Sequence, residues 1–281
     1  MLATWESIQE EQQSWARQRG IKFDDDGYVL SLDDNLFSSL LPETRRELES
    51  GKVSELGDGN GRGKMQALHS SSALLVNVFQ YWRSRDVDGI ARACGASHGK
   101  TEMRFERTHP TPLGGIPPHL DVEFHSAGDT SLIAIESKFT ELYHRRTKRE
   151  IRDRYVTHRG LWADLPGCER LARRICEEQK GKTSFAHLDA PQLLKHILGL
   201  ATEYRPSGFE LLYLWYDLPS PEASKHRQEL REFKEYVSVD VPFRDMTYQE
   251  LFDVLKISLN ADRDYLSYLG ERYFLHASEN Q

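Results

Sequence analysis

The sequence has few cysteines and no long hydrophobic run. Cys94, Cys168 and Cys176 are odd in number and widely spaced, which argues against a disulfide framework and for a reducing compartment. No apolar segment approaches the roughly 20 residues that a helix needs to cross a bilayer. The N-terminal segment MLATWESIQEEQQSW is polar and acidic, so we expect no secretory signal, no membrane contact and a cytoplasmic location.

An excess of positive charge is also missing, because the formal net charge is −7. A chain of this charge does not bind nucleic acid through its overall field. The charge is uneven, however, since residues 143–182 hold 12 Lys or Arg against 6 Asp or Glu. Two interpretations of this basic segment stay open: a surface that contacts phosphates at one place, and a solvated helical face.

Several motifs of known chemistry are absent. The glycine-rich stretch from Gly57 to Gly63 lacks the spacing of a phosphate-binding loop, and no strong strand pattern precedes it. We therefore expect a flexible turn there, with phosphate binding as the alternative. No Gly-x-Ser-x-Gly nucleophile motif is present, and the histidine and cysteine spacings do not match a zinc finger.

What the sequence does contain is a periodic pattern typical of a mixed α/β domain, in a chain of 281 residues of which 38% are hydrophobic. The pattern predicts helices over residues 3–19, from Leu41, and over 64–85, 192–204 and 222–237. It predicts strands over residues 102–107, 119–125, 132–139 and 209–216, with 28–31 and 241–248 as further candidates. Residues 140–190 are expected to be mostly helical and charged.

Two expected strands carry acidic residues in an apolar setting. Residues 119–125 alternate strictly, which puts Asp121 on the polar face of that strand. Residues 132–139 are apolar until Glu136 and Lys138, and these two point together because residues two apart on a strand share a face. If the strands pair, Asp121 lies beside Glu136.

These are the residue types that metal-dependent phosphodiester hydrolysis needs. Magnesium prefers hard oxygen ligands, here the carboxylates of Asp121 and Glu136, the Ser137 carbonyl and water. The ion lowers the pKa of bound water and offsets charge on phosphorus, while Lys138 orients the water or stabilises the developing charge. The alternative is a purely structural cluster, because a charge in an apolar strand costs roughly several kcal/mol unless it is paired.

The sequence segments around these residues resemble those of a known nuclease superfamily. HLD at residues 119–121, followed by IAIESK at residues 133–138, resembles the PD-(D/E)xK nucleases. The segments LHSSSALLVNVFQYW, AIESKFTE and QLLKHILGL resemble more specifically a family of bacterial proteins described as restriction endonucleases. The resemblance covers about residues 60–220 and implies an α/β restriction-endonuclease-like core, with a central mixed β-sheet flanked by helices. The core elements would be residues 65–83, 102–107, 119–125, 132–139, 191–204 and 209–216.

This resemblance implies cleavage of DNA with Mg²⁺, or with Mn²⁺ as an alternative ion. Asp121 and Glu136 would be metal ligands, and Lys138 would be the water-orienting base or charge stabiliser. Gln192 would support the site from the next helix, as a glutamine does in some relatives. The alternative for Gln192 is a polar residue near solvent at a helix N-terminus.

Two departures from the family pattern bear on the metal. Leu120 stands where many members have proline, which is a mild change. Residues 65–83 contain no acid, although many members carry a glutamate on this first helix, and this puts a second metal ion in doubt. Glu123 either contacts the metal or has a solvated or salt-bridged role, and we interpret His119 and His125 as surface histidines.

The basic stretch that follows the site strand is the candidate nucleic-acid contact. As a hypothesis, it lines the DNA path, with Arg145, Arg146, Lys148 and Arg149 contacting phosphates.

We expect one nuclease domain over residues 1–281, with an N-terminal elaboration (1–60), a core (61–220) that carries a helical insertion (140–190), and a C-terminal helical extension (221–281). The expected function is a divalent-metal-dependent endonuclease acting on DNA in restriction or defence. A homodimer and a cognate methyltransferase are the expected partners. The alternatives are a nuclease of repair or recombination, and a catalytically silent nucleic-acid-binding module of the same fold.

Overall fold

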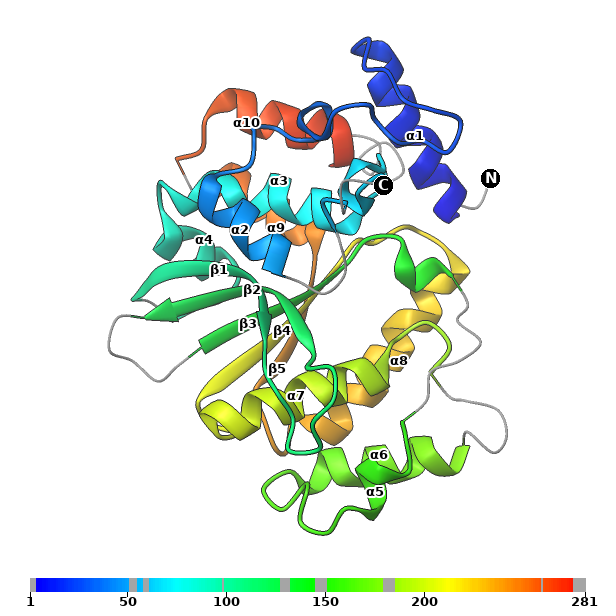
Figure 1. Cartoon of the computed structure of the whole chain (residues 1–281), viewed down its shortest axis with the longest axis vertical. Coiled ribbons are helices and arrows are strands. Elements are labelled where there is room, and N and C mark those ends of the chain that lie inside the picture. Colours follow the sequence, from blue (N-terminus) through cyan, green and yellow to red (C-terminus); the bar gives the residue numbers. More distant parts are fainter. Residues whose placement is uncertain are drawn as a thin grey trace.

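The computed structural model describes residues 4–50, 55–57, 61–97, 99–126, 132–144, 151–178, 185–258 and 260–274. A five-stranded sheet lies between layers of helices (Figure 1). The strands are β1 (Lys100–Thr108), β2 (His119–Ser126), β3 (Leu132–Lys138), β4 (Phe209–Trp215) and β5 (Phe243–Thr247). The α-helices are α1 (Trp5–Gln18), α2 (Pro42–Ser50), α3 (Ser71–Arg83), α4 (Val87–Ala93), α5 (Arg154–Thr157), α6 (Pro166–Glu178), α7 (Ala190–Tyr204), α8 (Pro221–Val237), α9 (Tyr248–Ser258) and α10 (Arg263–Leu269). Short 3₁₀ turns cover Leu32–Asn35, Lys64–Gln66 and Glu141–Tyr143, and a π-helical turn covers Gly270–Phe274.

The sheet is mixed, and its strands stand in the order β1-β2-β3-β4-β5. β1, β2 and β3 are antiparallel neighbours, whereas β3, β4 and β5 run parallel. The parallel pairs are joined by helical crossovers, α7 before β4 and α8 before β5, as parallel strands require. The expected α/β fold with a central mixed sheet is confirmed.

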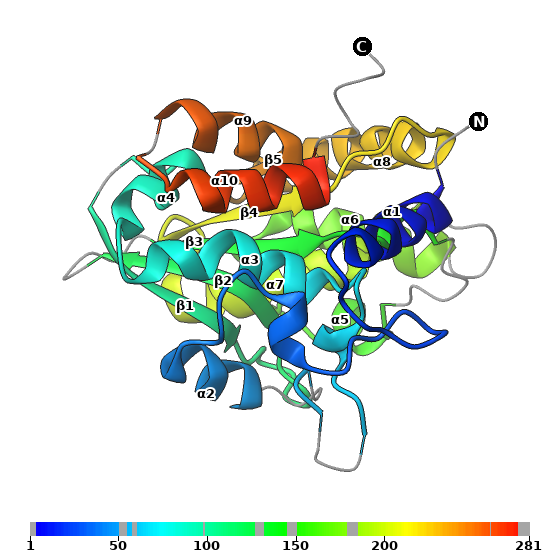
Figure 2. The same cartoon turned by 90° about the horizontal axis from the view of Figure 1, so that it is seen from above.

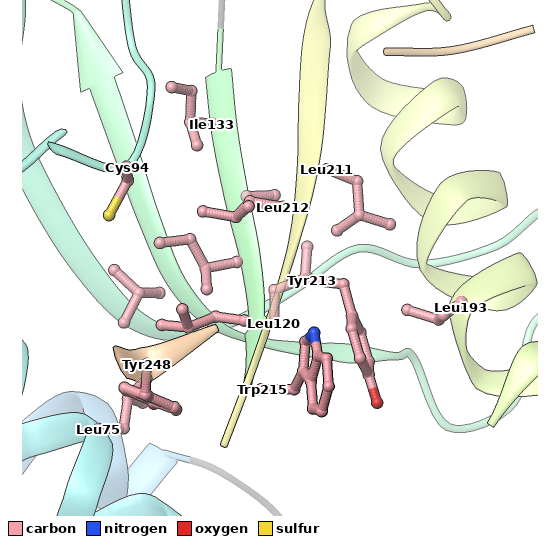
Figure 3. Close-up of a cluster of buried hydrophobic side chains, with 14 of the residues drawn as sticks. Leu75, Cys94, Leu120, Ile133, Leu193, Leu211, Leu212, Tyr213, Trp215 and Tyr248 are labelled. Atoms are coloured by element: carbon pink, nitrogen blue, oxygen red, sulfur yellow. The ribbon is translucent and has the colours of Figure 1, made fainter. Parts of the chain in front are cut away.

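Apolar side chains cover both faces of the sheet. One face packs against α3 and α9, and the other packs against α7 and α8 (Figure 1, Figure 2). Figure 3 shows this division, with Leu75 and Tyr248 on one side of the strands and Leu193 and Tyr213 on the other. Strands β3 and β4 are buried along nearly their whole length, so a charged residue placed there is enclosed by protein.

Two of the expected elements are wrong in the part nearest the N-terminus. The helix expected over residues 64–85 is a 3₁₀ turn followed by α3, because Ser70 caps α3 by accepting a hydrogen bond from the Ala73 N–H at 3.2 Å. The candidate strand at residues 28–31 is not formed. Only isolated bridges occur there, one of them between Tyr28 and Ala67.

The segment expected to be mostly helical, residues 140–190, is less regular than its charge pattern indicates. Its described part holds α5 and α6, with irregular backbone between them. Buried aromatic anchors hold that backbone: the indole N–H of Trp162 donates to the Tyr155 carbonyl at 2.6 Å. Packing rather than helix periodicity therefore orders this segment.

The sequence also led us to expect no disulfide framework and no membrane-spanning helix. Cys94, Cys168 and Cys176 are buried and unbridged, which confirms that no disulfide framework is present. Among the described residues, no helix combines the length and the apolar character that a membrane span requires. The division of the chain into a core and extensions stays a prediction.

Candidate active site

The candidate active site lies where β2 and β3 separate. Their registered pairs end at Val122↔Ile135, so the next residues, Asp121 and Glu136, come opposite each other just beyond the last pair. The Asp121 carboxylate accepts a hydrogen bond from the backbone N–H of Ser137 at 2.6 Å. The structure thus brings together the two carboxylates named from the sequence, through the strand pairing that was expected.

The Ser137 carbonyl also points toward Asp121. The Ser137 side chain points to the other face of the sheet, where its hydroxyl shares a 2.6 Å hydrogen bond with the hydroxyl of Tyr248. The next carbonyl along β3, that of Lys138, accepts from the Tyr216 N–H at 2.9 Å, toward β4. Because carbonyls alternate in direction along a strand, the Ser137 carbonyl faces β2 and Asp121.

Lys138 is held by carboxylates. Its ammonium lies 2.5 Å from Oε1 of Glu136, and the two side chains are only 12% and 2% exposed. Glu141, in the turn after β3, accepts the Phe139 N–H at 2.8 Å. Burial disfavours the charge on Lys138, but Glu136, Glu141 and Asp121 outweigh it and raise the pKa of Lys138 above its usual value. Lys138 is therefore a cation at neutral pH.

For Asp121, by contrast, the surroundings disfavour the charged form. Its burial, followed by repulsion from Glu136, raises the pKa of the Asp121 carboxyl well above its usual value. One lysine does not neutralise the acidic groups gathered here. A divalent cation between the two carboxylates would relieve this excess of negative charge.

Glu106 is a further carboxylate that the sequence reasoning missed. The registered pairs of β1 with β2 on either side leave Glu106 opposite Asp121, and its backbone has a φ of +51°, a conformation that side chains other than glycine seldom adopt. Burial, then repulsion from Glu55 and Glu136, raises the pKa of Glu106 to about 7. The strand expected over residues 102–107 contains Glu106, but only the register shows what it faces.

A cavity of about 800 Å³ contains these groups, and α7 forms one wall. Gln192 lines the cavity, with its backbone N–H donating to the N-cap Asp189 at 3.0 Å. Its supporting role stays a prediction. His196, one turn further along α7, also lines the cavity but was not named from the sequence. The four-residue step from Gln192 was the available signal, because such residues share a helix face.

His196 is enclosed and lies close to Glu136. Its side chain is 1% exposed, and Nε2 is 3.3 Å from Oε2 of Glu136. Among the described residues, neither ring nitrogen of His196 nor that Glu136 oxygen has a hydrogen-bond partner. Burial lowers the pKa of His196 despite the attraction of Glu136, so the ring is neutral.

The other residues of the polar face of β2 are paired. Glu123 is fully buried, and its two oxygens contact Nε2 of His109 and, at 2.8 Å, Nε2 of His125. Burial alone would raise the pKa of Glu123, but these two histidines lower it to about 2. Of the two interpretations, the salt-bridged one agrees with this geometry. His119 lies 3.7 Å from Glu106, so the interpretation of His119 and His125 as surface histidines is wrong: each is partly enclosed and paired with a carboxylate.

The four residues predicted to contact phosphates, Arg145, Arg146, Lys148 and Arg149, lie outside the described residues, and this hypothesis stays a prediction. Other cations do line the cavity, namely Lys64 and Lys195. Lys195 stands 5.7 Å from the ring centre of Tyr155, which shows that the segment after β3 reaches the cavity.

The donors present suit a hard cation. Within the described ranges, no three His, Cys, Asp or Glu side chains form a group that holds a metal by itself. Magnesium does not need such a cage, since one or two carboxylates with carbonyl and water ligands suffice. The repulsion between Asp121 and Glu136 fits a cation held by these two carboxylates and the Ser137 carbonyl.

A family model described as "Restriction Endonuclease associating with ARP" (REase-ARP) matches residues 9–274. The chain belongs to the REase-ARP family. No curated protein and no solved structure shows a significant match to it. The match to REase-ARP confirms the restriction endonuclease resemblance and extends it beyond the 60–220 segment that carried it. The family indicates a nuclease role for the chain, acting on DNA.

Proposed function

We propose that this REase-ARP chain is a divalent-metal-dependent endonuclease that hydrolyses phosphodiester bonds in DNA. The observation that carries the proposal is the enclosed meeting of Asp121, Glu136 and Lys138 at the point where β2 and β3 separate. Buried like charges are costly, and this pair is retained at the wall of a large cavity. Such clusters are typical of functional sites.

Each residue has a defined role in this proposal. Asp121, Glu136 and the Ser137 carbonyl would hold Mg²⁺ or Mn²⁺, which supplies an activated water and offsets charge on phosphorus when bound. Lys138 orients the attacking water and stabilises charge on the phosphate oxygens. In the metal-free protein the surrounding carboxylates raise the pKa of Lys138, and we assign it the role of charge stabiliser rather than that of the base. Gln192 contributes to substrate or water placement from the α7 wall.

The test is cleavage of plasmid DNA with Mg²⁺ by wild type, Lys138→Ala and Asp121→Asn. We expect both variants to lose about a hundredfold or more in rate, because each loses charge stabilisation in an enclosed site. Asp245→Asn is the matched control: it makes the same chemical change at an exposed position on β5, and it should cleave as wild type does. Circular dichroism checks that all variants fold.

Equal activity in all variants would reject the site. A Mg²⁺ titration by calorimetry separates the proposal from the silent nucleic-acid-binding module, since the silent module should bind the ion poorly or not at all. The place of the protein in restriction or defence, a homodimer, a cognate methyltransferase and the cytoplasmic location all stay predictions.

A further inference from the structure

A buried histidine faces the catalytic glutamate from outside the strand that carries it. His196 comes from α7, and its Nε2 lies 3.3 Å from Oε2 of Glu136. Both atoms are enclosed and, among the described residues, neither has a hydrogen-bond partner. Buried polar atoms are normally satisfied, so two unsatisfied atoms facing each other at the wall of the cavity call for an explanation.

We propose that His196 is a positioning residue that holds Glu136 in the orientation in which it binds the metal, an inference that rests on the proposed function. A carboxylate only accepts hydrogen bonds, so the ring proton that faces it is on Nε2. The terminal torsion of a glutamate is broad, and a small rotation of the Glu136 carboxylate aligns Oε2 with that N–H.

A hydrogen bond from His196 to Glu136 also bears on the role of Lys138. Oε1 of Glu136 is engaged by the Lys138 ammonium at 2.5 Å, so in this arrangement the two groups neutralise each other. A Glu136 carboxylate that is also held through its second oxygen leaves more of the Lys138 ammonium, which has three donors, free to orient a water. His196 is placed to hold the second oxygen of Glu136. Its side chain is almost fully buried, so water does not compete for this hydrogen bond. Partners of metal-binding carboxylates set their orientation in this way.

The first measurement is Mg²⁺ affinity by calorimetry in His196→Phe, which keeps an aromatic ring and removes the N–H. We expect the affinity to fall by about 10- to 100-fold, with a lower kcat and an unchanged KM for DNA. His196→Gln returns a donor on a flexible side chain and should recover most of the affinity. His226→Phe is the matched control, because His226 is also fully buried but bonds to Tyr213 rather than to Glu136 and does not line the cavity; its Mg²⁺ affinity should match wild type.

The second measurement needs neither metal nor activity. ¹⁵N NMR of the Mg²⁺-free protein should show His196 with its proton on Nε2, and Glu136→Gln should shift that signal. A proton on Nδ1, or a folded His196→Phe with wild-type affinity, would overturn the inference. If wild type itself binds no Mg²⁺, the proposed function fails, and the NMR result still decides whether His196 bonds to Glu136.

Discussion

Glu106, Asp121 and Glu136 come from three neighbouring strands and lie in one cavity with the ammonium group of Lys138. Asp121 and Glu106 both have raised pKa values, in each case first through burial and then through repulsion by other acids. Lys138 compensates only part of this charge. At the residue scale, the metal-free site is therefore a source of instability that a bound cation would remove.

This instability can be measured at Glu106. The pKa of Glu106 is about 7 in the folded chain, above its unfolded value, so the folded state binds the extra proton and loses stability as pH rises from about 4 to 7. Glu106→Gln mimics the protonated form. We expect it to stabilise the metal-free protein at pH 8.5 by roughly 1 to 3 kcal/mol, as measured by urea denaturation in EDTA.

The same comparison at pH 4 should show little difference, because Glu106 is then protonated in the folded state and mostly protonated in the unfolded state. Glu102→Gln is the control: Glu102 is on the same strand but is exposed and paired with Arg104, and its replacement should not stabilise. A Glu106→Gln variant no more stable than wild type at pH 8.5 would contradict the assigned repulsion.

At the element scale, His109 joins the loop after β1 to two neighbours. Its Nε2 contacts the buried Glu123 of β2, and its Nδ1 lies 2.8 Å from Glu203 of α7. The helix comes very close at Gly199, where an added Cβ would lie 2.4 Å from the His109 carbonyl oxygen. This contact sets the position of α7, which carries Gln192 and His196 to the cavity.

The His109 contacts predict a pH dependence of stability. Burial disfavours the charged ring, but Glu123 and then Glu203 outweigh this and raise the pKa of His109. The stabilisation is therefore complete below the unfolded pKa of about 6.5 and is lost as pH rises through the higher folded pKa. His109→Gln should cost roughly 3 kcal/mol at pH 6 and less at pH 9, as measured by urea denaturation.

His158→Gln serves as the control, because His158 is exposed and its replacement should leave the pH profile unchanged. If the wild-type profile and the His109→Gln profile stay parallel from pH 6 to pH 9, His109 is not held as a cation.

At the scale of the whole molecule, Arg272 ties together segments that are remote in the sequence. It is 2% exposed and donates to Gln12 of α1 at 3.0 Å, to the Asn35 carbonyl at 2.8 Å and to the Leu68 carbonyl at 3.2 Å. Its guanidinium also lies over the Trp15 ring, at 4.4 Å from the centroid. The N-terminal and C-terminal segments therefore pack on each other and on the segment that leads to α3 and the cavity.

We expect Arg272→Met to destabilise the whole chain by at least about 3 kcal/mol, because several buried acceptors lose their donor at once. Intrinsic tryptophan fluorescence during urea unfolding measures this directly. Arg263→Met, at an exposed position on α10, should change stability by less than about 0.5 kcal/mol. A single transition that Arg272→Met leaves near its wild-type midpoint would show that the terminal segments are not coupled to the rest of the chain through Arg272.

The local sequence pattern was enough to predict most of the strands and part of the candidate site. The alternation of β2 placed Asp121 on the polar face of that strand, and the pattern of β3 placed Glu136 and Lys138 on one face of theirs, because a strand's period depends only on its own residues. The same local reasoning failed at the start of α3. The apolar pattern predicted a helix from residue 64, but the helix begins after Ser70, which caps it.

The sequence by itself determined the residue types of the site and the faces on which they stand. Only the tertiary structure decided that Glu106 lies opposite Asp121 and that His196 reaches Glu136. It also decided that Arg272 joins the two ends of the chain. Register, helix docking and the burial of charge depend on contacts between residues far apart in the chain, and no local periodicity encodes those contacts.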